Sequence, residues 1–362
     1  MQHTAKSFPE TVDFVAADKL LSSISMGQPH PPEPISGPLA LYGQGNLGKL
    51  AVGYCKTVGQ PIEAVFDQSD IFPPEKNELS VAVCVVNEPY VPIESFLLRR
   101  FKQVVPFYDL TEKYRHKHPL SNGWFLGDIS PNTATVLNWW DDDTSRAHHL
   151  QFLAWRRLRE EWTFDEYPVF PQNRYFIPEV VSAITCEETF LDIGAHHGEV
   201  VETFLKKVSG YYNKIIAIEA DPANFKILNS KLPKKDVITL KRVISDTATT
   251  RRFTDQLDYM SQLSEHEGVL VHTDVIDDMG INPTFIKVHL EGHELAALKG
   301  AERTILDNRP IIAATVYHND DGVWKTPMWL METLDNYRVL FRNHGWCGTG
   351  AVVYAIPEER CK

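Results

Sequence analysis

An apolar strand that runs directly into a glycine-rich turn is the feature that most limits what this chain can form. Residues 189–193, "TFLDI", read as a buried strand, and a helical pattern over 198–208 follows. The junction combines one acid with three small residues: Asp192, Gly194, Ala195 and Gly198. Small residues let the backbone approach a ligand closely, and the start of a helix offers unpaired backbone N–H groups. The junction therefore predicts a ligand-binding turn.

The segments after this turn alternate between apolar strands and helical patterns. Helices are predicted over 198–208, 222–231, 293–307 and 327–336. Such alternation implies a parallel sheet, and a shorter stretch of the same kind begins at residue 38. The predicted fold class is α/β, with a smaller Rossmann-like domain in front of a larger one. The predicted segments are an N-terminal arm and proline-rich linker (1–37), a small Rossmann-like nucleotide-binding domain (38–110), a helical, aromatic-rich connecting region (111–180) and the large domain (181–362).

The acid before the glycines, Asp192, indicates what kind of ligand the turn would bind. Dinucleotide folds usually leave this turn uncharged for a pyrophosphate, whereas Asp192 suits a ligand with a positive amino group. S-adenosylmethionine (SAM) has that group and no phosphate. The next strand, "KIIAIEA", ends in Glu219, about 20 residues beyond the last glycine, where nucleotide-binding α/β folds hold ribose hydroxyls.

Several blocks together resemble the FkbM-type methyltransferases in order and spacing: "FLDIGAHHGEV", "AIEADPANF", "LKRVISD", "TDVIDDM", "FIKVHLEGHELAALKGA" and "AATVYHNDDGVWKTP". The resemblance runs from about residue 174 to 357. It implies a seven-stranded class I methyltransferase domain and SAM-dependent O-methylation of a sugar or secondary-metabolite hydroxyl. By resemblance, the methionine end of the cofactor would be lined by Asp192, Gly194, Ala195 and Gly198, the ribose held by Glu219, and the adenine bordered by Ala220, Asp221, Ser245 and Asp246.

The strand at 284–290 carries polar residues at every second position. Lys287, His289 and Glu291 would therefore point to one face of the sheet. The family usually has Asp where this chain has His289. Two interpretations stay open: His289 is the general base for the acceptor hydroxyl, with basicity raised by Glu291, or it only positions the substrate. His318, after the next strand, is the rival base.

Other polar residues near these blocks have competing interpretations. Lys287 is expected to form a salt bridge with an acid such as Asp277 or Glu291, and with Glu291 to shape the pocket. Asp277 is either a substrate-side acid or a turn former, and Arg342 either reaches the substrate or is solvent-exposed.

Histidines elsewhere in these blocks raise the question of a metal. A site built from His289, Glu291 and His293 is conceivable, but transfer from a sulfonium does not require a metal, so none is predicted. The pairs His196–His197 and His148–His149 are expected in turns and on the surface. The second of these pairs falls in a predicted helix with Leu150, Leu153 and Leu158 as its apolar stripe.

A second glycine-rich turn, "LYGQGNLG", has the GxGxxG spacing of dinucleotide-binding folds. Gly43, Gly45 and Gly48 lie between a strand and a helix, and Asp67 ends the next strand. Three interpretations compete: a nucleotide or nucleotide-sugar site, an NAD site, or a degenerate domain kept for packing or dimerisation. A nucleotide-linked sugar acceptor docked here is one hypothesis, and a homo-oligomer stays open.

Composition excludes some classes of partner. The formal net charge is −12 and no Lys/Arg run exceeds two, which argues against sequence-independent nucleic-acid binding. No stretch approaches the roughly 20 apolar residues of a membrane span. Five scattered cysteines without CxxC spacing favour a reducing cytoplasm. The predicted function is SAM-dependent O-methylation of a sugar or sugar-containing metabolite. The alternative is an NAD- or nucleotide-sugar-binding protein, oxidoreductase or non-catalytic sensor, whose methyltransferase half is inactive.

Overall fold

The computed structural model describes residues 2–70, 77–114, 125–232, 235–255, 257, 261–264 and 268–361. Parts of the predicted small domain and connecting region, residues 71–76 and 115–124, lie outside these ranges. Over the described ranges, no helix has the length and apolar character to cross a membrane. The chain divides into two compact units: unit 1 comprises 1–171 and 342–351, and unit 2 comprises 172–341 and 352–362. The four-segment division of the sequence stays a prediction.

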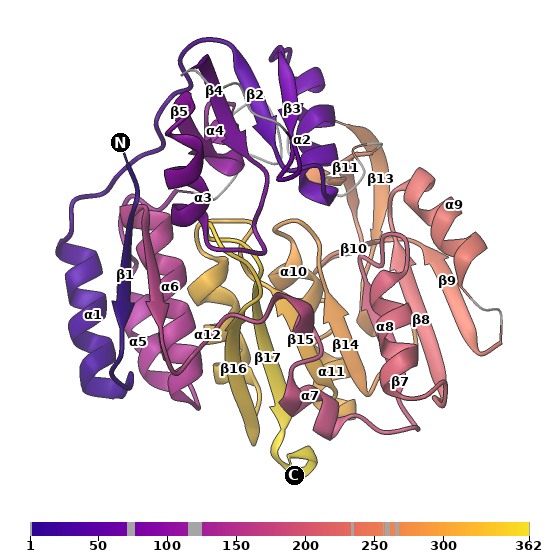
Figure 1. The fold of residues 1–362 in the computed structure, drawn as a ribbon. Helices are drawn as coiled ribbons and strands as arrows, with labels where there is room; N and C mark the ends of the chain where they lie inside the picture. Colours follow the sequence, from indigo (N-terminus) through magenta and orange to yellow (C-terminus); the bar gives the residue numbers. More distant parts are fainter. Residues whose placement is uncertain are drawn as a thin grey trace. The chain divides into compact units, whose positions relative to one another are not determined.

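Unit 1 contains a small parallel sheet of the predicted kind, with strand order β3-β2-β4-β5 (Figure 1). Its described elements are β1 (Thr4–Phe8), α1 (Phe14–Met26), β2 (Leu39–Tyr42), α2 (Asn46–Thr57), β3 (Ala64–Phe66), β4 (Asn77–Val83), α3 (Tyr90–Leu97), β5 (Phe101–Pro106), α4 (Phe107–Glu112), α5 (Pro131–Trp139), α6 (Asp143–Leu158) and β6 (Glu160–Phe164). The strand order reverses between β2 and β4, and ligands of open α/β sheets bind outside the carboxyl ends of the strands at such a point.

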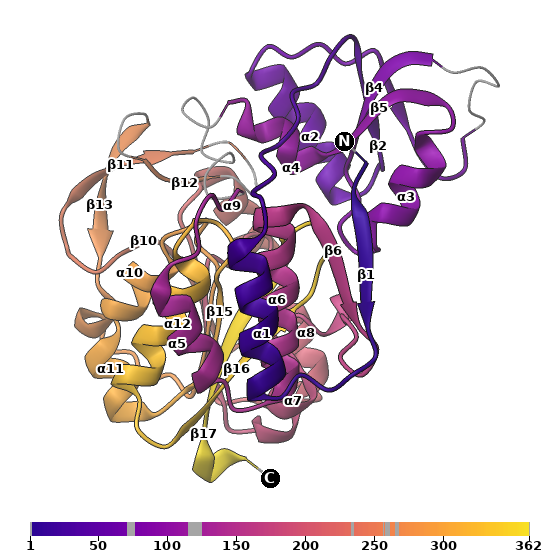
Figure 2. The same ribbon diagram turned by 90° about the vertical axis from the view of Figure 1, so that its left-hand side faces the viewer.

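The predicted N-terminal arm is more ordered than the sequence suggested. Strand β1 pairs in parallel with β6, and α1 packs beside α5 and α6 (Figures 1 and 2). Asp13 caps α1 by accepting a hydrogen bond from the Ala16 N–H at 2.8 Å. The arm thus belongs to the helical layer of unit 1, and the proline-rich stretch after α1 lacks regular structure.

The prediction that His148 and His149 form a surface pair is wrong. Helix α6 is buried on all sides from Ser145 to Leu158, not along one stripe. His148 Nδ1 accepts a hydrogen bond from the Asn343 N–H at 3.1 Å, and its Nε2 lies 3.0 Å from the Tyr167 carbonyl oxygen. His149 Nδ1 accepts from the indole N–H of Trp140 at 3.0 Å. Burial lowers the pKa of His148 to about 4 and that of His149 to about 3, so both are neutral at pH 7.

Unit 2 holds a seven-stranded sheet in the order β16-β17-β15-β14-β7-β8-β9. The strands β15, β14, β7, β8 and β9 run parallel to one another, and β17 is antiparallel to β15. Its described elements are α7 (Pro178–Ala183), β7 (Thr189–Ile193), α8 (Glu199–Lys207), β8 (Lys214–Glu219), α9 (Pro222–Lys231), β9 (Val237–Lys241), β10 (Val243–Ile244), β11 (Thr250–Thr254), β12 (Gln262–Ser264), β13 (Val269–Asp274), β14 (Phe285–Val288), α10 (Glu294–Lys299), α11 (Glu302–Asn308), β15 (Ile311–Thr315), α12 (Gly322–Thr333), β16 (Tyr337–Asn343, which ends in unit 1) and β17 (Ala351–Pro357).

Two stretches of unit 2 are interrupted, and the second of them was predicted to be continuous. The apolar run at 237–245 forms β9 and then β10, which belongs to a separate four-stranded sheet, β10-β13-β11-β12. The helix predicted over 293–307 is divided into α10 and α11 at Gly300. A Cβ on Gly300 would lie 2.2 Å from the Ser245 carbonyl oxygen, so this close approach accounts for the glycine.

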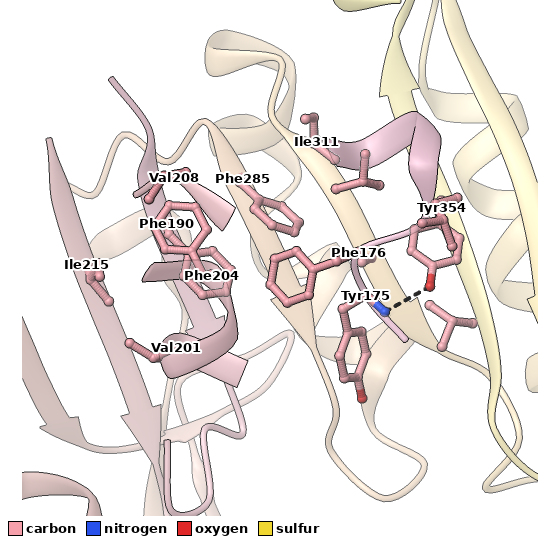
Figure 3. Packing of buried hydrophobic residues seen from close by; sticks show 14 of the residues in the cluster. Tyr175, Phe176, Phe190, Val201, Phe204, Val208, Ile215, Phe285, Ile311 and Tyr354 are labelled. Carbon is pink, nitrogen blue, oxygen red and sulfur yellow. Dashed lines mark hydrogen bonds between the residues drawn. The ribbon is translucent and has the colours of Figure 1, made fainter. Parts of the chain in front are cut away.

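Aromatic packing holds the centre of the large sheet together (Figure 3). The Phe190 ring of β7 lies 4.6 Å from that of Phe204 on α8 and 4.8 Å from that of Phe285 on β14. Phe176 packs edge-on against Phe285, and the neighbouring Tyr175 N–H donates to the Tyr354 hydroxyl at 3.0 Å. These contacts fix the segment before α7 against the sheet. Figure 3 shows the Tyr175 hydroxyl pointing away from the aromatic cluster.

The buried histidines of α6 predict an acid-sensitive unit 1. Because the folded-state pKa values lie below the ordinary value near 6.5, the unfolded chain binds the extra protons, and stability falls as pH drops from about 6.5 toward 4. Each histidine contributes up to about 1.4 kcal/mol per pH unit over this range. Replacing His149 by Gln should reduce the loss of unfolding free energy between pH 7 and pH 5 by about 2 kcal/mol, measured by urea titration with tryptophan fluorescence.

The exposed His272 provides the matched control, because His272→Gln should leave the pH dependence as in the unmodified protein. If the free energy of unfolding depends equally steeply on pH with and without His149, the loss of stability in acid does not come from protonation of this histidine.

Candidate active site

The glycine turn after β7 brings two strand ends into contact. Gly194 has φ 76°, and a Cβ at this position would lie 1.9 Å from the His289 carbonyl oxygen. The His289 N–H in turn donates to the Ile193 carbonyl at 3.0 Å. Glycine is therefore required at 194, both for the left-handed backbone and for the close approach of the segment after β14. The turn positions His289 directly beside the predicted cofactor residues.

Lys287 forms a buried ion pair, but with a different acid from those predicted. Its Nζ lies 2.9 Å from Asp192 Oδ1, and the two side chains are 2% and 0% exposed. Nζ also donates to the Gly194 carbonyl at 2.7 Å. Burial raises the pKa of Asp192, and the Lys287 ammonium opposes that rise. The partner was missed because Asp192 lies opposite Lys287 on the neighbouring strand, far away in the sequence.

A cavity of about 660 Å³, counting its open mouth, lies at the carboxyl ends of β7, β8 and β14. Its lining includes Gly194, Glu219 and Ala220 from the predicted cofactor set. Glu219 accepts from the His196 N–H at 2.7 Å and the Asp221 N–H at 2.9 Å, so its carboxylate is held at the cavity wall. Burial is the main cause that raises the pKa of Glu219.

An apolar wall from the smaller sheet closes another side of this cavity. Ile244, Phe253 and Leu263 line it, a composition suited to a flat aromatic ring such as adenine. Six predicted cofactor residues are not part of the lining: Asp192, Ala195, Gly198, Asp221, Ser245 and Asp246. Of these six, only Asp246 is exposed. Asp221 caps α9 through the Ala223 and Asn224 N–H groups. Their cofactor roles stay predictions.

Three side chains meet where the cavity adjoins the ends of β14 and β15, and we call them the His–Glu–His cluster: His289, Glu291 and His318. Their nearest atoms are His289 Nε2 and His318 Nε2 at 3.1 Å, His289 Nε2 and Glu291 Oε1 at 3.1 Å, and His318 Nδ1 and Glu291 Oε2 at 3.0 Å. The prediction placed Glu291 on a strand face, but β14 ends at Val288 and Glu291 has φ 49°. Glu291 reaches the cluster through a left-handed backbone.

The electrostatics of the cluster differ from the sequence-based expectation. Burial lowers the pKa of His289 to about 3; the hydrogen bond that its ring can donate to the Glu291 carboxylate opposes this lowering, and the Arg174 charge adds to it. Burial alone would raise the pKa of Glu291, yet His318 and His289 hold it below its usual range. At neutral pH, His289 is therefore an uncharged imidazole beside an ionised carboxylate. The carboxylate does raise the basicity of His289 as predicted, but burial outweighs it.

Sequence reasoning missed two residues beside the cluster. The Tyr175 hydroxyl lies 2.9 Å from His289 Nδ1, and Arg174 donates to the Tyr317 hydroxyl at 2.8 Å. Both precede the strongly periodic part of unit 2. Their only sequence signal is an arginine–tyrosine pair next to "FIP", which gives no indication of contact with a strand more than 100 residues away.

The two residues predicted on the substrate side have structural partners. Asp277 accepts hydrogen bonds from the Arg303 and Thr304 N–H groups at the start of α11. These bonds favour the interpretation of Asp277 as a turn and cap residue over that of a substrate-side acid. Arg342 lies in unit 1, where it forms a two-pronged ion pair with Asp142 at 2.7 and 3.1 Å and is buried, not solvent-exposed. A substrate role for either residue stays a prediction.

The GxGxxG turn of unit 1 also borders a cavity, of about 1020 Å³ counting its open mouth. Gly43, Gly45 and Asp67 line it at the carboxyl ends of β2 and β3. Gly48 does not; a Cβ there would lie 1.9 Å from the Gly43 carbonyl oxygen, so Gly48 serves the packing of α2 on the turn. Gly45 starts α2, and a Cβ on it would meet nothing within 4 Å.

A seven-stranded sheet of this order, with a glycine turn after β7 and an acid ending β8, defines a Rossmann-like methyltransferase fold. Residues 192–345 match the profile of the methyltransferase FkbM domain. Residues 192–345 therefore form a domain of the FkbM methyltransferase type, as the resemblance predicted, and this family implies methylation that depends on SAM.

A search of solved structures finds one protein of similar fold and others with a lower score. The methyltransferase FkbM of Methylobacillus flagellatus KT is 16% identical, with a TM-score of 0.56 over 94% of this chain and 98% of that chain. The precorrin-6y C5,15-methyltransferase of Geobacter metallireducens GS-15 is 13% identical, with a TM-score of 0.33 over 53% of this chain and 95% of that chain. No curated protein matches the sequence. The first likeness confirms the predicted fold class.

Removing one partner of the Lys287–Asp192 pair should destabilise unit 2 strongly. Lys287→Met leaves a buried carboxylate without its cation and should lower the free energy of unfolding by about 3–5 kcal/mol. The double variant Lys287→Met/Asp192→Asn should regain part of that loss, because the charge is removed together with its partner. Urea unfolding followed by circular dichroism measures both changes.

Lys325→Met is the control, since Lys325 is exposed and its pair with Asp321 in α12 should contribute no more than about 1 kcal/mol. Equal losses for Lys287→Met and Lys325→Met would show that the buried pair does not hold the two central strands.

Proposed function

We propose that unit 2 transfers the methyl group of SAM to a hydroxyl of a sugar or sugar-containing metabolite. The observation that carries the proposal is a single cavity with two chemically different ends. Glu219 and an apolar wall suit the ribose and adenine of the cofactor, and His289 with Glu291 borders the other end. Polar imidazole and carboxylate groups suit the recognition of a hydroxyl, and the family resemblance supports a saccharide acceptor.

The chemistry is an in-line displacement at the methyl carbon. The bond from sulfur to methyl breaks, its electron pair neutralises the sulfonium, and the acceptor oxygen forms the new bond while its proton leaves. His289 is the member of the His–Glu–His cluster proposed to receive that proton. An imidazole with a pKa near 3 is a weak base alone, so the adjacent Glu291 carboxylate and His318 have to stabilise the charge as it forms. Lys287 holds the turn and takes no proton.

A second proposal concerns unit 1, where the GxGxxG turn would bind a nucleotide, nucleotide-sugar or NAD. Gly45 opens toward a cavity at the start of α2, whose backbone N–H groups suit a phosphate, and Asp67 at the end of β3 suits a ribose. A nucleotide-linked sugar is one ligand that would suit this turn. An oxidoreductase or a non-catalytic sensor is the alternative use of the same turn. The five cysteines are free, which supports a cytoplasmic setting.

Methyl transfer is tested with isotopically labelled SAM and a panel of free and nucleotide-linked sugars. His289→Gln should lower kcat by about 10²–10⁴-fold and leave the affinity for S-adenosylhomocysteine nearly unchanged, because the residue acts on the acceptor proton. Glu219→Gln should weaken S-adenosylhomocysteine binding by about 10-fold, measured by calorimetry, because it loses a charge-assisted bond to the ribose.

Glu202→Gln on the exposed side of α8 is the control and should change neither quantity. Tight S-adenosylhomocysteine binding without transfer to any saccharide hydroxyl would refute the acceptor class. Absence of cofactor binding would refute the proposed site itself.

The unit 1 site is tested by Gly45→Ala. Because the added methyl meets no protein atom and Gly45 has φ −69°, the fold should be unaffected, whereas a phosphate bound against the turn would be displaced. Calorimetry with NAD and a uridine-diphosphate sugar should show binding to the unmodified chain that weakens by about 10-fold or more in the variant.

Gly53→Ala, in the middle of α2 with equally open surroundings, is the matched control and should bind as the unmodified chain does. Binding that survives Gly45→Ala would place any nucleotide elsewhere.

A further inference from the structure

The His–Glu–His cluster poses a problem of hydrogen-bonding partners. His289 and His318 direct their Nε2 atoms at each other across 3.1 Å, and Glu291 Oε1 lies 3.1 Å from the first of them. Two imidazole lone pairs cannot face each other at this distance without a proton or a cation between them. Ligand atoms bound to one zinc ion at about 2.0–2.1 Å are themselves about 3 Å apart. The spacing therefore fits a shared ion.

We propose that His289, Glu291 and His318 bind one divalent first-row transition metal ion, with Zn²⁺ as the reference ion. The three side chains each offer one ligand atom, and these atoms all lie within 4.8 Å of one another. Two imidazoles and one carboxylate form a ligand set used by catalytic zinc and non-haem iron sites, which keep further positions open.

His289 has the partner that a metal-binding histidine requires. The Tyr175 hydroxyl lies 2.9 Å from His289 Nδ1. With Nε2 on the ion, Nδ1 of His289 carries hydrogen and donates to this oxygen. The Glu291 carboxylate also contacts His318, with Oε2 3.0 Å from Nδ1. Such outer hydrogen bonds fix the tautomer and the ring orientation of a ligand histidine. The polypeptide therefore supplies the second layer of the site as well as the ligands.

The backbone at Glu291 is held in place although it is unfavourable. Glu291 has φ 49° and Gly292 has φ 103°. The Glu294 carboxylate accepts from the Leu290 and Gly292 N–H groups, both at 3.0 Å, which locks the loop. A non-glycine residue in the left-handed region costs on the order of 1–3 kcal/mol and persists where the surroundings impose it. Here that conformation directs the Glu291 carboxylate at both imidazoles.

The only other group of potential metal ligands among the described residues lacks these features. It consists of His196, His197 and Glu199. Glu199 is exposed and lies 3.3 Å from the Lys231 ammonium, and His197 Nε2 already lies 3.1 Å from Asn224 Oδ1. The second group therefore offers a natural control within the same unit.

A role for the ion rests on the proposed function. His289 and Glu291 line the cavity, so an open coordination position would face the acceptor. A hydroxyl oxygen bound there would lose its proton more readily, because the cation stabilises the alkoxide that attacks the methyl carbon.

Metal binding is tested on the full chain without cofactor or acceptor. The protein, purified without a histidine tag and stripped with a chelator, is titrated with Zn²⁺ by calorimetry, and with Co²⁺ by visible absorption, which reports imidazole ligation. One ion per chain is expected. Glu291→Gln and His318→Ala should abolish that binding, Tyr175→Phe should weaken it by about 10-fold, and Glu199→Gln should leave it unchanged. Circular dichroism establishes that each variant is folded.

Three results would overturn the proposal: no stoichiometric binding of either ion, binding that persists in folded Glu291→Gln, or binding that is lost in Glu199→Gln. None of them bears on methyl transfer, since no cofactor is present. Conversely, one bound ion in a chain that methylates no saccharide would leave the metal site standing and refute only the acceptor class.

Discussion

The buried pair between Lys287 and Asp192 is the interaction on which the site depends. In the parallel register of β14 on β7, these two residues stand opposite each other, and the ion pair at 2.9 Å joins them across the centre of the sheet. A buried charge is tolerated only beside its counter-charge, so a shift of one strand along the other would leave both unpaired. The pair therefore sets the height at which the glycine turn meets the end of β14.

Once the register of the two strands is set, the positions of the other site residues are determined by their contacts with these strands. Lys287 also holds the Gly194 carbonyl, and the missing side chain of Gly194 lets the His289 backbone pass directly over the turn. His289 then meets Tyr175, which the aromatic core anchors, and His318, which follows β15. The carboxyl ends of parallel strands bring side chains from distant segments to one edge of the sheet, which is why the cavity and the His–Glu–His cluster adjoin each other.

The sequence predicted the parts of the structure that depend on local pattern. Helix α9 occupies the predicted 222–231, and the glycine turn and Glu219 border one cavity. Prediction from the sequence failed for residues whose positions depend on contacts with distant parts of the chain. The alternation of polar and apolar residues could not predict the position of Glu291. Strand β14 ends at Val288, and Glu291 itself has a left-handed backbone conformation. His148 was assigned to the surface, because its partner Asn343 lies almost 200 residues away and no local pattern reveals it.

The imidazole of His289 changes the charge and the available ligand atoms of the cluster, compared with an acid at this position. The sequence blocks resemble a family that usually carries Asp at this position, and a second carboxylate beside Glu291 would gather two negative charges. His289 instead gives the cluster two nitrogens and one carboxylate, with the nitrogens 3.1 Å apart. The cluster acts as a base if it takes up the proton of a hydroxyl, whereas a cation held between the nitrogens acts as a Lewis acid. Both activate a hydroxyl, but only the cation does so without requiring a desolvated imidazole to become charged.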